Sequence, residues 1–264
     1  MNNSAPIGIF DSGVGGTSIW KEIVTLMPSE STCYLADSKH APYGGKTPDQ
    51  IRDLCIKNTE KLIEFGAKII VVACNTATTN AIDHLRNHYT IPFIGIEPAI
   101  KPAALESKNG IIGILATQGT LNSKLFVDTS ERFAGNLKRI EVVGSGLVPL
   151  IEDGALGSPE LEKLLATYLA PMIEASIDHL VLGCSHYPYL IPLLTKLLPA
   201  NVTIIDSGQA VAKQTKAVLE NHQQLAKDTT PAPNHILYSN TSTTTLETLV
   251  GDFTKHIQFQ YLAF

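Results

Sequence analysis

Short apolar runs rich in β-branched residues alternate with longer amphipathic stretches along this chain, as far as about residue 224. We predict strands at Ile7–Phe10, Thr32–Ala36, Ile69–Ala73, Pro92–Gly95, Ile111–Leu115, Ile140–Val143, His179–Leu182 and Val202–Ile205. A helix is clearest between them where Leu161, Leu165 and Met172 follow a helical spacing. Continuous apolar strands separated by helices are typical of parallel sheets covered on both faces, so the sequence predicts an α/β fold.

Three segments of the first half recur in the second half, in the same order and at similar spacing. Ile7-Gly-Ile-Phe-Asp-Ser-Gly is echoed by Ile112-Gly-Ile-Leu-Ala-Thr-Gln-Gly, Ile69-Ile-Val-Val-Ala-Cys-Asn by His179-Leu-Val-Leu-Gly-Cys-Ser, and Phe93-Ile-Gly-Ile-Glu-Pro-Ala by Val202-Thr-Ile-Ile-Asp-Ser-Gly. A general likeness among parallel strands is the alternative, but it does not explain Cys74 and Cys184 at equivalent strand ends. We therefore predict two similar domains, each with a mainly parallel sheet flanked by helices, related by pseudo-two-fold symmetry. The first would comprise residues 1–97 and 208–264, and the second residues 98–207.

The segment after Asn221 has a different character. A predicted loop starts at Lys227, and short strands at Ile236–Ser239 and Ile257–Tyr261 flank a predicted helix at Thr243–Val250. This segment is too short to form a core alone, so we expect it to pack on the first domain.

Composition excludes several classes of partner. Twenty Lys and Arg against 25 Asp and Glu give a formal net charge of −5, and no stretch is densely basic, so neither nucleic acid nor membrane is expected as a partner. Residues 1–6 lack a secretory signal, and the longest apolar runs are far shorter than a membrane span. Four scattered cysteines do not form a disulfide scaffold. We expect a cytoplasmic protein that acts on a small molecule.

Polar and reactive side chains follow the predicted strands, and ligands of open α/β sheets bind at that carboxyl edge. These segments are Asp11-Ser-Gly-Val-Gly-Gly, Asp37-Ser-Lys-His-Ala-Pro-Tyr-Gly-Gly, Cys74-Asn-Thr-Ala and Cys184-Ser-His-Tyr-Pro. Gly13-Val-Gly15 could begin a dinucleotide motif, but its third glycine would fall at Ser18, and Asp11 lies where a pyrophosphate would bind. We expect instead a tight turn whose N–H groups approach a small anion.

Cys74 and Cys184 each precede a predicted helix start, where N–H groups and the helix dipole would lower the pKa of a thiol. Cys33 and Cys55 read as small buried residues. A Cys–His nucleophile at Cys184 and His186 remains open, but it gives Cys74 no role, and the same pair is an incomplete metal-ligand set.

Two thiols that face each other across a domain cleft can perform a different reaction. One removes a proton from one face of a carbon atom, and the other returns a proton to the opposite face. Such a site must also bind the substrate carboxylate and the developing negative charge. Ser12, Asn75, Thr76 and Ser185 are suitable donors for this task.

The motifs together resemble those of the glutamate racemases, in the cofactor-independent aspartate/glutamate racemase superfamily. They are Phe10-Asp-Ser-Gly-Val-Gly-Gly, Ala41-Pro-Tyr-Gly, Ala73-Cys-Asn-Thr-Ala, Ile151-Glu-Asp-Gly and Gly183-Cys-Ser-His-Tyr-Pro, and they occur in the family's order over nearly the whole chain. The resemblance implies a glutamate racemase that supplies D-glutamate for peptidoglycan synthesis. It implies an active site in the cleft between two domains and no pyridoxal phosphate, metal or nucleotide cofactor, and it allows a homodimer.

The resemblance also assigns roles to individual residues. It implies that Cys74, assisted by Asp11, handles the proton of D-glutamate. It implies that Cys184, assisted by His186 and Glu152, handles the proton of L-glutamate. The implied substrate contacts are Asp11, Ser12, Pro42, Tyr43, Gly44, Asn75, Thr76, Ser185 and His186.

The chain departs from the family pattern at Ser185, where threonine is usual; the hydroxyl group is retained. Only ten residues precede Asp11, so we expect the longer N-terminal extension of relatives regulated by a cell-wall precursor to be missing. Racemisation of aspartate stays open, because one methylene in a pocket is worth only about 1–3 kcal/mol. From another class, a two-domain binding protein for small solutes would share the paired α/β halves, but it would not need two cysteines.

Overall fold

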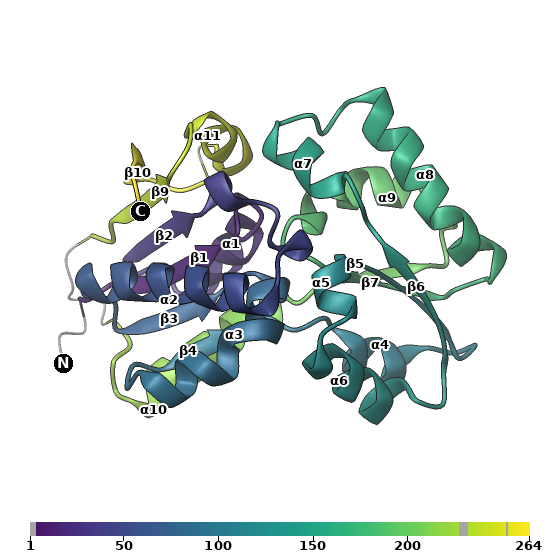
Figure 1. Cartoon of the computed structure of the whole chain (residues 1–264), viewed down its shortest axis with the longest axis horizontal. Coiled ribbons are helices and arrows are strands. Elements are labelled where there is room, and N and C mark those ends of the chain that lie inside the picture. The colour runs from purple at the N-terminus through teal and green to yellow at the C-terminus, as the bar shows by residue number, and fades with distance from the viewer. Residues whose placement is uncertain (1–3, 227–231, 252) are drawn as a thin grey trace.

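The computed structural model describes residues 4–226, 232–251 and 253–264, and it has two separate parallel sheets (Figure 1). The larger sheet has the order β10-β9-β2-β1-β3-β4, and the smaller has the order β6-β5-β7-β8. The strands are β1 (Ile7–Asp11), β2 (Thr32–Ala36), β3 (Ile69–Val72), β4 (Phe93–Gly95), β5 (Ile111–Ala116), β6 (Lys138–Val143), β7 (His179–Gly183), β8 (Thr203–Ile205), β9 (His235–Ser239) and β10 (Ile257–Tyr261). All neighbouring strands are parallel.

The predicted α/β class is confirmed, and every predicted strand is present with bounds that differ by at most two residues. The strand order β2-β1-β3-β4 of the larger sheet is repeated as β6-β5-β7-β8 in the smaller one. The sequence echoes pair β1 with β5, β3 with β7 and β4 with β8, in agreement with this shared order. The two-fold relation between the halves stays a prediction.

Helices connect the strands and cover the sheets. They are α1 (Thr17–Leu26), α2 (Pro48–Glu64), α3 (Asn75–His88), α4 (Ile100–Glu106), α5 (Gln118–Leu121), α6 (Lys124–Ala134), α7 (Leu147–Glu152), α8 (Pro159–Glu174), α9 (Ile191–Leu197), α10 (Gly208–Asn221) and α11 (Thr244–Val250), with short 3-10 turns η1 (Ser38–His40), η2 (Tyr43–Gly45) and η3 (Tyr187–Leu190). The predicted helical spacing is realised in α8, where Leu161, Leu165 and Met172 are buried. The Ser158 side chain begins this helix by accepting a hydrogen bond from the N–H of Leu161 (3.2 Å).

Both faces of the larger sheet are buried at the inner strands β1, β2 and β3, whose successive side chains point to opposite sides. Ile9 of β1 lies in the same apolar cluster as Trp20 of α1, whereas the next residue, Phe10, lies in the cluster that contains Ile51 of α2. This double cover explains why β3 and residues 7–10 of β1 lack polar side chains at every position rather than at alternate ones.

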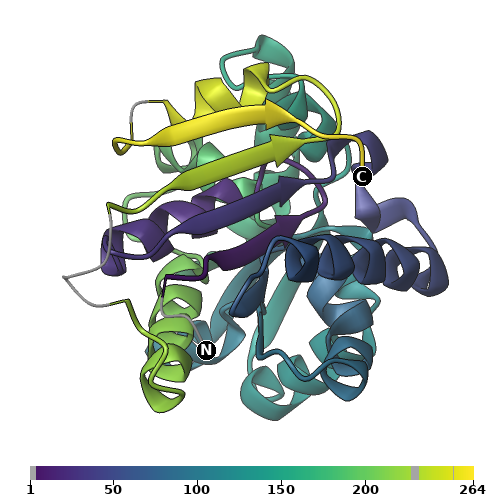
Figure 2. The same ribbon diagram turned by 90° about the vertical axis from the view of Figure 1, so that its left-hand side faces the viewer.

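The C-terminal segment completes the larger sheet, as expected. β9 pairs with β2 in the register Thr32↔His235, and β10 lies outside β9, so β10, β9, β2 and β1 run side by side in Figure 2. Trp20, the single tryptophan, donates to the Thr32 hydroxyl (2.7 Å), which lies 3.0 Å from Nδ1 of His235. The predicted loop from Lys227 lies partly outside the described residues. Within the described part of the chain, no helix has both the length and the apolar character needed to cross a membrane.

Candidate active site

Cys74 and Cys184 line one cavity, although they come from different sheets. Cys74 follows β3 and is the N-cap residue of α3, and Cys184 follows β7 at the equivalent position. The lining residues are Ser12, Pro42, Tyr43, Gly44, Cys74, Asn75, Thr76, Thr117, Val148, Cys184, Ser185 and His186. All predicted site residues except Asp11 and Glu152 are among them. The cavity measures about 10 Å³, close to the space that a single water needs.

Thr117 and Val148 line the cavity and were not predicted from the sequence. The Thr117 hydroxyl lies 2.8 Å from that of Thr76 and 3.0 Å from that of Thr120, so a trio of hydroxyl groups joins the start of α3 to α5. The internal repeat could have pointed to Thr117, because Ala116-Thr117 in the second half corresponds to Asp11-Ser12 in the first. Val148 carried no signal, since an apolar residue in a helix is ordinarily a core residue.

Asp11 is fully buried behind the cavity at the end of β1. Its Oδ2 accepts hydrogen bonds from the N–H groups of Gly13 (3.2 Å) and Gly16 (3.0 Å), and its Oδ1 accepts one from the Ser185 hydroxyl (3.0 Å). Burial raises the pKa of Asp11, although the nearby His186 charge opposes this. Asp11 therefore acts on the cavity through Ser185 and the glycine turn.

The expectation of a small bound anion at the glycine turn is corrected by the structure. The anionic groups at this turn belong to the protein itself: Asp11 accepts from two of its N–H groups, and Oε1 of Glu152 accepts from the N–H of Val14 (2.7 Å). A Cβ on Gly13 would lie 2.0 Å from Oε1 of Glu152, and one on Gly15 would lie 2.2 Å from Nδ1 of His186. Both glycines are required because a buried acid–imidazole pair packs directly against the turn.

His186 and Glu152 form that pair, with Nε2 of His186 2.5 Å from Oε1 of Glu152. Ser38 donates to Oε2 of Glu152 (2.8 Å), and Nδ1 of His186 lies 3.8 Å from Sγ of Cys184. Burial alone would lower the pKa of His186, but hydrogen bonds with Cys184 and Glu152 raise it well above its usual value. For Glu152, burial would raise the pKa, but its bonds to His186 and Val14 leave it lowered. His186 is therefore cationic and Glu152 anionic at neutral pH.

The surroundings of Cys74 contradict the expected lowering of its pKa. Burial, followed by the charge of Asp11, raises the pKa of this thiol well above its ordinary value. The N–H of Ala77 (3.4 Å from Sγ) and the Ser12 hydroxyl (3.6 Å) oppose the shift but do not overcome it. Cys74 is thus a protonated thiol at neutral pH, because the loss of hydration outweighs the helix start.

The side-chain amide of Asn75 is the clearest sign that the cavity binds a polar ligand. Asn75 is only 2% exposed, and neither its oxygen nor its nitrogen has a hydrogen-bond partner among the described residues. Buried polar atoms are nearly always paired, so an unpaired amide that lines a cavity is typical of a group that pairs with a ligand.

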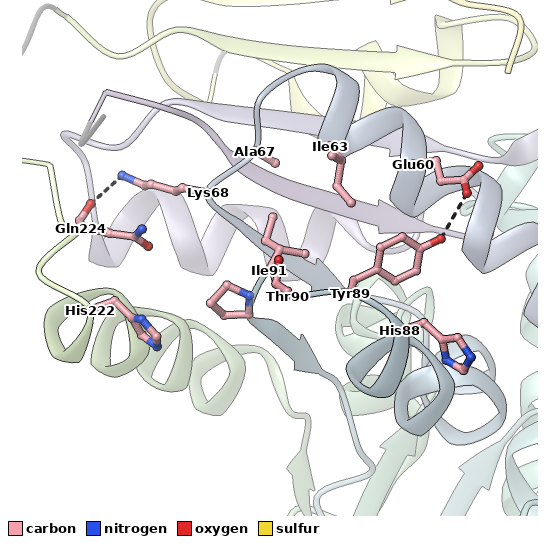
Figure 3. A pocket seen from close by; sticks show the side chains of 11 residues that line it. Glu60, Ile63, Ala67, Lys68, His88, Tyr89, Thr90, Ile91, His222 and Gln224 are labelled. Carbon is pink, nitrogen blue, oxygen red and sulfur yellow. Dashed lines mark hydrogen bonds between the residues drawn. The ribbon is translucent and has the colours of Figure 1, made fainter. Parts of the chain in front are cut away.

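A larger cavity, about 680 Å³, lies near the opposite edge of the larger sheet, beside the residues that precede β3 and β4 (Figure 3). Two pairs of its polar groups are bonded to each other: Tyr89 donates to Glu60 (3.3 Å), and Lys68 donates to the carbonyl of Gln224 (2.9 Å). It contains neither cysteine, so the candidate active site remains the cavity between Cys74 and Cys184. Among the described residues, no three His, Cys, Asp or Glu side chains are grouped to hold a metal ion.

Comparison with known proteins identifies the family. Residues 13–215 match the model of the Asp/Glu/hydantoin racemase family. The glutamate racemase of Pseudomonas putida (strain W619) is 47% identical over 248 residues, which cover 94% of this chain and 93% of that protein.

Two solved structures are similar over nearly the full length. The Escherichia coli glutamate racemase in complex with L-glutamate and the activator UDP-MurNAc-ala superposes with a TM-score of 0.87 at 32% identity, covering 98% of both chains. The Francisella tularensis glutamate racemase in complex with D-glutamate gives 0.82 at 27% identity, again covering 98% of both. With paired cysteines at equivalent strand ends and this likeness along almost its whole length, the chain belongs to the glutamate racemases of the Asp/Glu/hydantoin racemase family.

Proposed function

We propose that this chain interconverts L-glutamate and D-glutamate by a two-base reaction in which Cys74 and Cys184 act on opposite faces of the α-carbon. The observation that carries the proposal is that thiols from the equivalent ends of β3 and β7 line one cavity together with the unpaired amide of Asn75. Similar proteins hold L-glutamate in one structure and D-glutamate in another, which supports glutamate over aspartate as the substrate.

The two thiols are proposed to exchange roles with the direction of reaction. From L-glutamate, the Cys184 thiolate takes the α-proton, and the Cys74 thiol gives its proton to the other face. The raised pKa of Cys74 suits a proton donor, and the cationic His186 beside Cys184 can stabilise a thiolate there. From D-glutamate, Cys74 takes the proton and Cys184 gives one.

Each turnover leaves the wrong thiol protonated for a second turnover in the same direction. After L-glutamate has reacted, Cys184 carries a proton and Cys74 lacks one. In the reset, Cys184 loses its proton to solvent water and Cys74 takes a proton from solvent water. The cationic His186 beside Cys184 favours a thiolate there, and the negative charge of Asp11 raises the affinity of Cys74 for a proton. Asp11 and the His186–Glu152 pair therefore favour the reset of the two bases in this mechanism.

The substrate carboxylates are assigned to the polar lining. Asn75 and Thr76 lie at the start of α3, where unpaired N–H groups and the helix dipole favour an anion. Ser12 and Ser185 supply hydroxyl groups on the two sides of the cavity, and Pro42, Tyr43 and Gly44 form its wall. These donors would also stabilise the negative charge that develops as the α-proton leaves.

The cavity must widen for the substrate to bind. Glutamate is far larger than a water molecule, and the cavity of about 10 Å³ holds about one water. We assign residues 1–97 with 208–264 and residues 98–207 to the two domains that would separate. The packing of α10 on α1 and β4, and of α4 on α6 and β7, supports this division.

The remaining assignments follow the family resemblance. We place the enzyme in the cytoplasm, supplying D-glutamate for peptidoglycan synthesis, with a homodimer as the oligomer to test by light scattering. No pyridoxal phosphate, metal or nucleotide is assigned to the reaction. Activity that vanished on dialysis against a chelator would contradict this.

Incubation of the purified protein with L-glutamate alone tests the function. A racemase drives the optical rotation to zero, whereas a solute-binding protein leaves it unchanged. A parallel incubation with L-aspartate separates the two substrates, and faster loss of rotation with aspartate would contradict the glutamate assignment.

A further inference from the structure

We infer that Asn240 is a positioning residue of the active site, which fixes the wall formed by Pro42, Tyr43 and Gly44 to the C-terminal segment. This inference rests on the proposed function. Asn240 directly follows β9, and no sequence motif pointed to it. It lies outside the cavity lining, so its effect is exerted through neighbouring residues.

Asn240 is 6% exposed and contacts the last residue of β2 once and the segment after β2 twice. Its Nδ2 donates to Oδ1 of Asp37 (2.5 Å), and its Oδ1 accepts from the N–H of Lys39 (2.8 Å). Its own N–H donates to the carbonyl of Ala36 (3.4 Å). A single side chain therefore holds both the carboxyl group of Asp37 and the backbone of the turn η1.

Asp37 transmits this constraint to the cavity wall. It is 2% exposed, and its Oδ2 accepts from the hydroxyl of Tyr43 (2.5 Å), which also accepts from the amide of Asn58 (3.1 Å). Nδ1 of His40 lies 2.6 Å from Oδ1 of Asp37. The Tyr43 ring is 1% exposed and lines the cavity next to Gly44. Asn240, Asp37 and Tyr43 thus form a continuous buried chain from the C-terminal segment to the substrate wall.

Two further contacts reach Glu152 of the His186–Glu152 pair, one from the turn η1 and one from the C-terminal segment. Ser38, in the turn held by Asn240, donates to Oε2 of Glu152 (2.8 Å), and Thr245 of α11 donates to the carbonyl of Glu152 (2.8 Å). In Figure 1, α11 lies beside α7, the helix that ends at Glu152. The C-terminal segment therefore supports the active site as well as extending the sheet.

The test compares the steady-state constants of wild type and Asn240→Ala with both enantiomers. The substitution removes the donor to Asp37 and the acceptor for Lys39. The wall formed by Pro42, Tyr43 and Gly44 is then held in place by fewer hydrogen bonds. We expect KM to rise about tenfold for each enantiomer, while kcat changes less than threefold. Thr241→Ala is the matched control, because Thr241 is the exposed neighbouring residue and bonds to Ser239; its KM should equal that of wild type.

A double variant that exchanges the side chains of Asn240 and Asp37 tests whether their contact sets KM. Asn240→Asp places a second carboxyl group beside Asp37 and should raise KM at least as much as Asn240→Ala. Adding Asp37→Asn to it restores an amide–carboxyl contact, so the double variant should have a lower KM than Asn240→Asp alone. Asn240→Asp also replaces Asn240→Ala as the test variant if the smaller side chain prevents folding, because it keeps the size of asparagine.

Two results would overturn the inference. One is a KM within twofold of wild type in both Asn240 variants. The other is loss of active protein at unchanged KM, as a purely structural residue would give. A wild-type chain that does not racemise glutamate would instead contradict the proposed function, so the two failures are distinguishable.

Discussion

At the scale of single residues, the two thiols differ in the groups that face them. Cys74 faces the buried carboxyl group of Asp11, whereas Cys184 faces a cationic imidazole paired with Glu152. A carbon centre can be inverted from either side only if each thiol can both give and take a proton. The two thiols therefore have unlike electrostatic surroundings, and those of Cys74 raise its pKa.

Replacement of either reactive thiol should stop racemisation in both directions. We expect Cys74→Ala and Cys184→Ala to lower kcat at least a thousandfold, because each direction uses both bases. Cys33→Ala and Cys55→Ala are the controls: both thiols are buried away from the cavity, and burial raises the pKa of Cys33 to about 12. Circular dichroism of glutamate over time gives the rates. Near wild-type activity in Cys184→Ala would refute the assignment.

His186→Asn should slow the reaction unequally, because Nδ1 of His186 lies 3.8 Å from Sγ of Cys184, whereas Sγ of Cys74 contacts Ser12 and Ala77. We expect a larger fall in kcat from L-glutamate, by about 10²-fold or more. Mirror-image substrates have equal free energies in water, so kcat/KM must remain equal in the two directions. KM must then shift in the same direction-dependent way as kcat. Initial rates from each enantiomer measure this, and equal losses of kcat would contradict the assigned role.

At the scale of elements, the glycine turn after β1 is shaped by side chains from the other half of the chain. Gly13→Ala should lower activity by 10²-fold or more, because its Cβ would lie 2.0 Å from the Glu152 carboxylate and would separate it from the turn. Gly157→Ala is the matched control, since a Cβ there meets no atom within 4 Å. Initial rates of the two variants provide the measurement. Full activity in Gly13→Ala would show that racemisation does not depend on the position of the Glu152 carboxylate.

The junction of β2 and β9 should make the protein sensitive to acid. Burial, with the nearby charge of His256, lowers the pKa of His235 to about 4, below its usual unfolded value of about 6.5. The unfolded chain therefore binds the proton first as the pH falls. The stability contributed by neutral His235 is complete above about pH 6.5 and is lost towards pH 4. After allowance for solvent screening, we expect a loss of about 1–2 kcal/mol in the free energy of unfolding between pH 7 and pH 4.5.

Urea unfolding followed by the fluorescence of Trp20 measures this loss, since that ring lies 5.6 Å from the His235 ring. His235→Gln keeps an acceptor for the Thr32 hydroxyl and does not titrate, so its stability should vary less with pH. His222→Gln, which replaces an exposed histidine, should keep the wild-type dependence. A His235→Gln profile that matches wild type would assign the acid sensitivity elsewhere.

The elements were largely predictable from the sequence, and the site's electrostatics were not. Strands buried on both faces leave continuous apolar runs, which made β1, β3 and β7 readable to within one or two residues. The pKa of Cys74 depends on burial, which only tertiary packing sets. The partner of the Val14 N–H is Glu152, 138 positions away, so no local pattern could have revealed it.

At the scale of the whole molecule, the two sheets present one thiol each, and this geometry predicts the path of the proton. Thiol protons exchange with solvent, so in D₂O the delivering thiol carries deuterium. D-Glutamate formed early from L-glutamate should carry deuterium at the α-carbon, and unreacted L-glutamate should stay almost unlabelled. Proton NMR of both enantiomers at low conversion provides the measurement. The reaction from D-glutamate must give the mirror result, and early product that retains its α-hydrogen would refute two bases.

The trio of threonine hydroxyls that joins α3 to α5 has a consequence for the handedness of the reaction. A hydroxyl can donate or accept a hydrogen bond by rotating about its C–O bond. The three contacts can therefore re-form with either enantiomer of the substrate beside them. Each contact contributes only about 1 kcal/mol net, and thermal motion on the microsecond to millisecond scale can break and restore it. We therefore expect the contacts between α3 and α5 to form with either enantiomer bound, so that neither L-glutamate nor D-glutamate is excluded from the site.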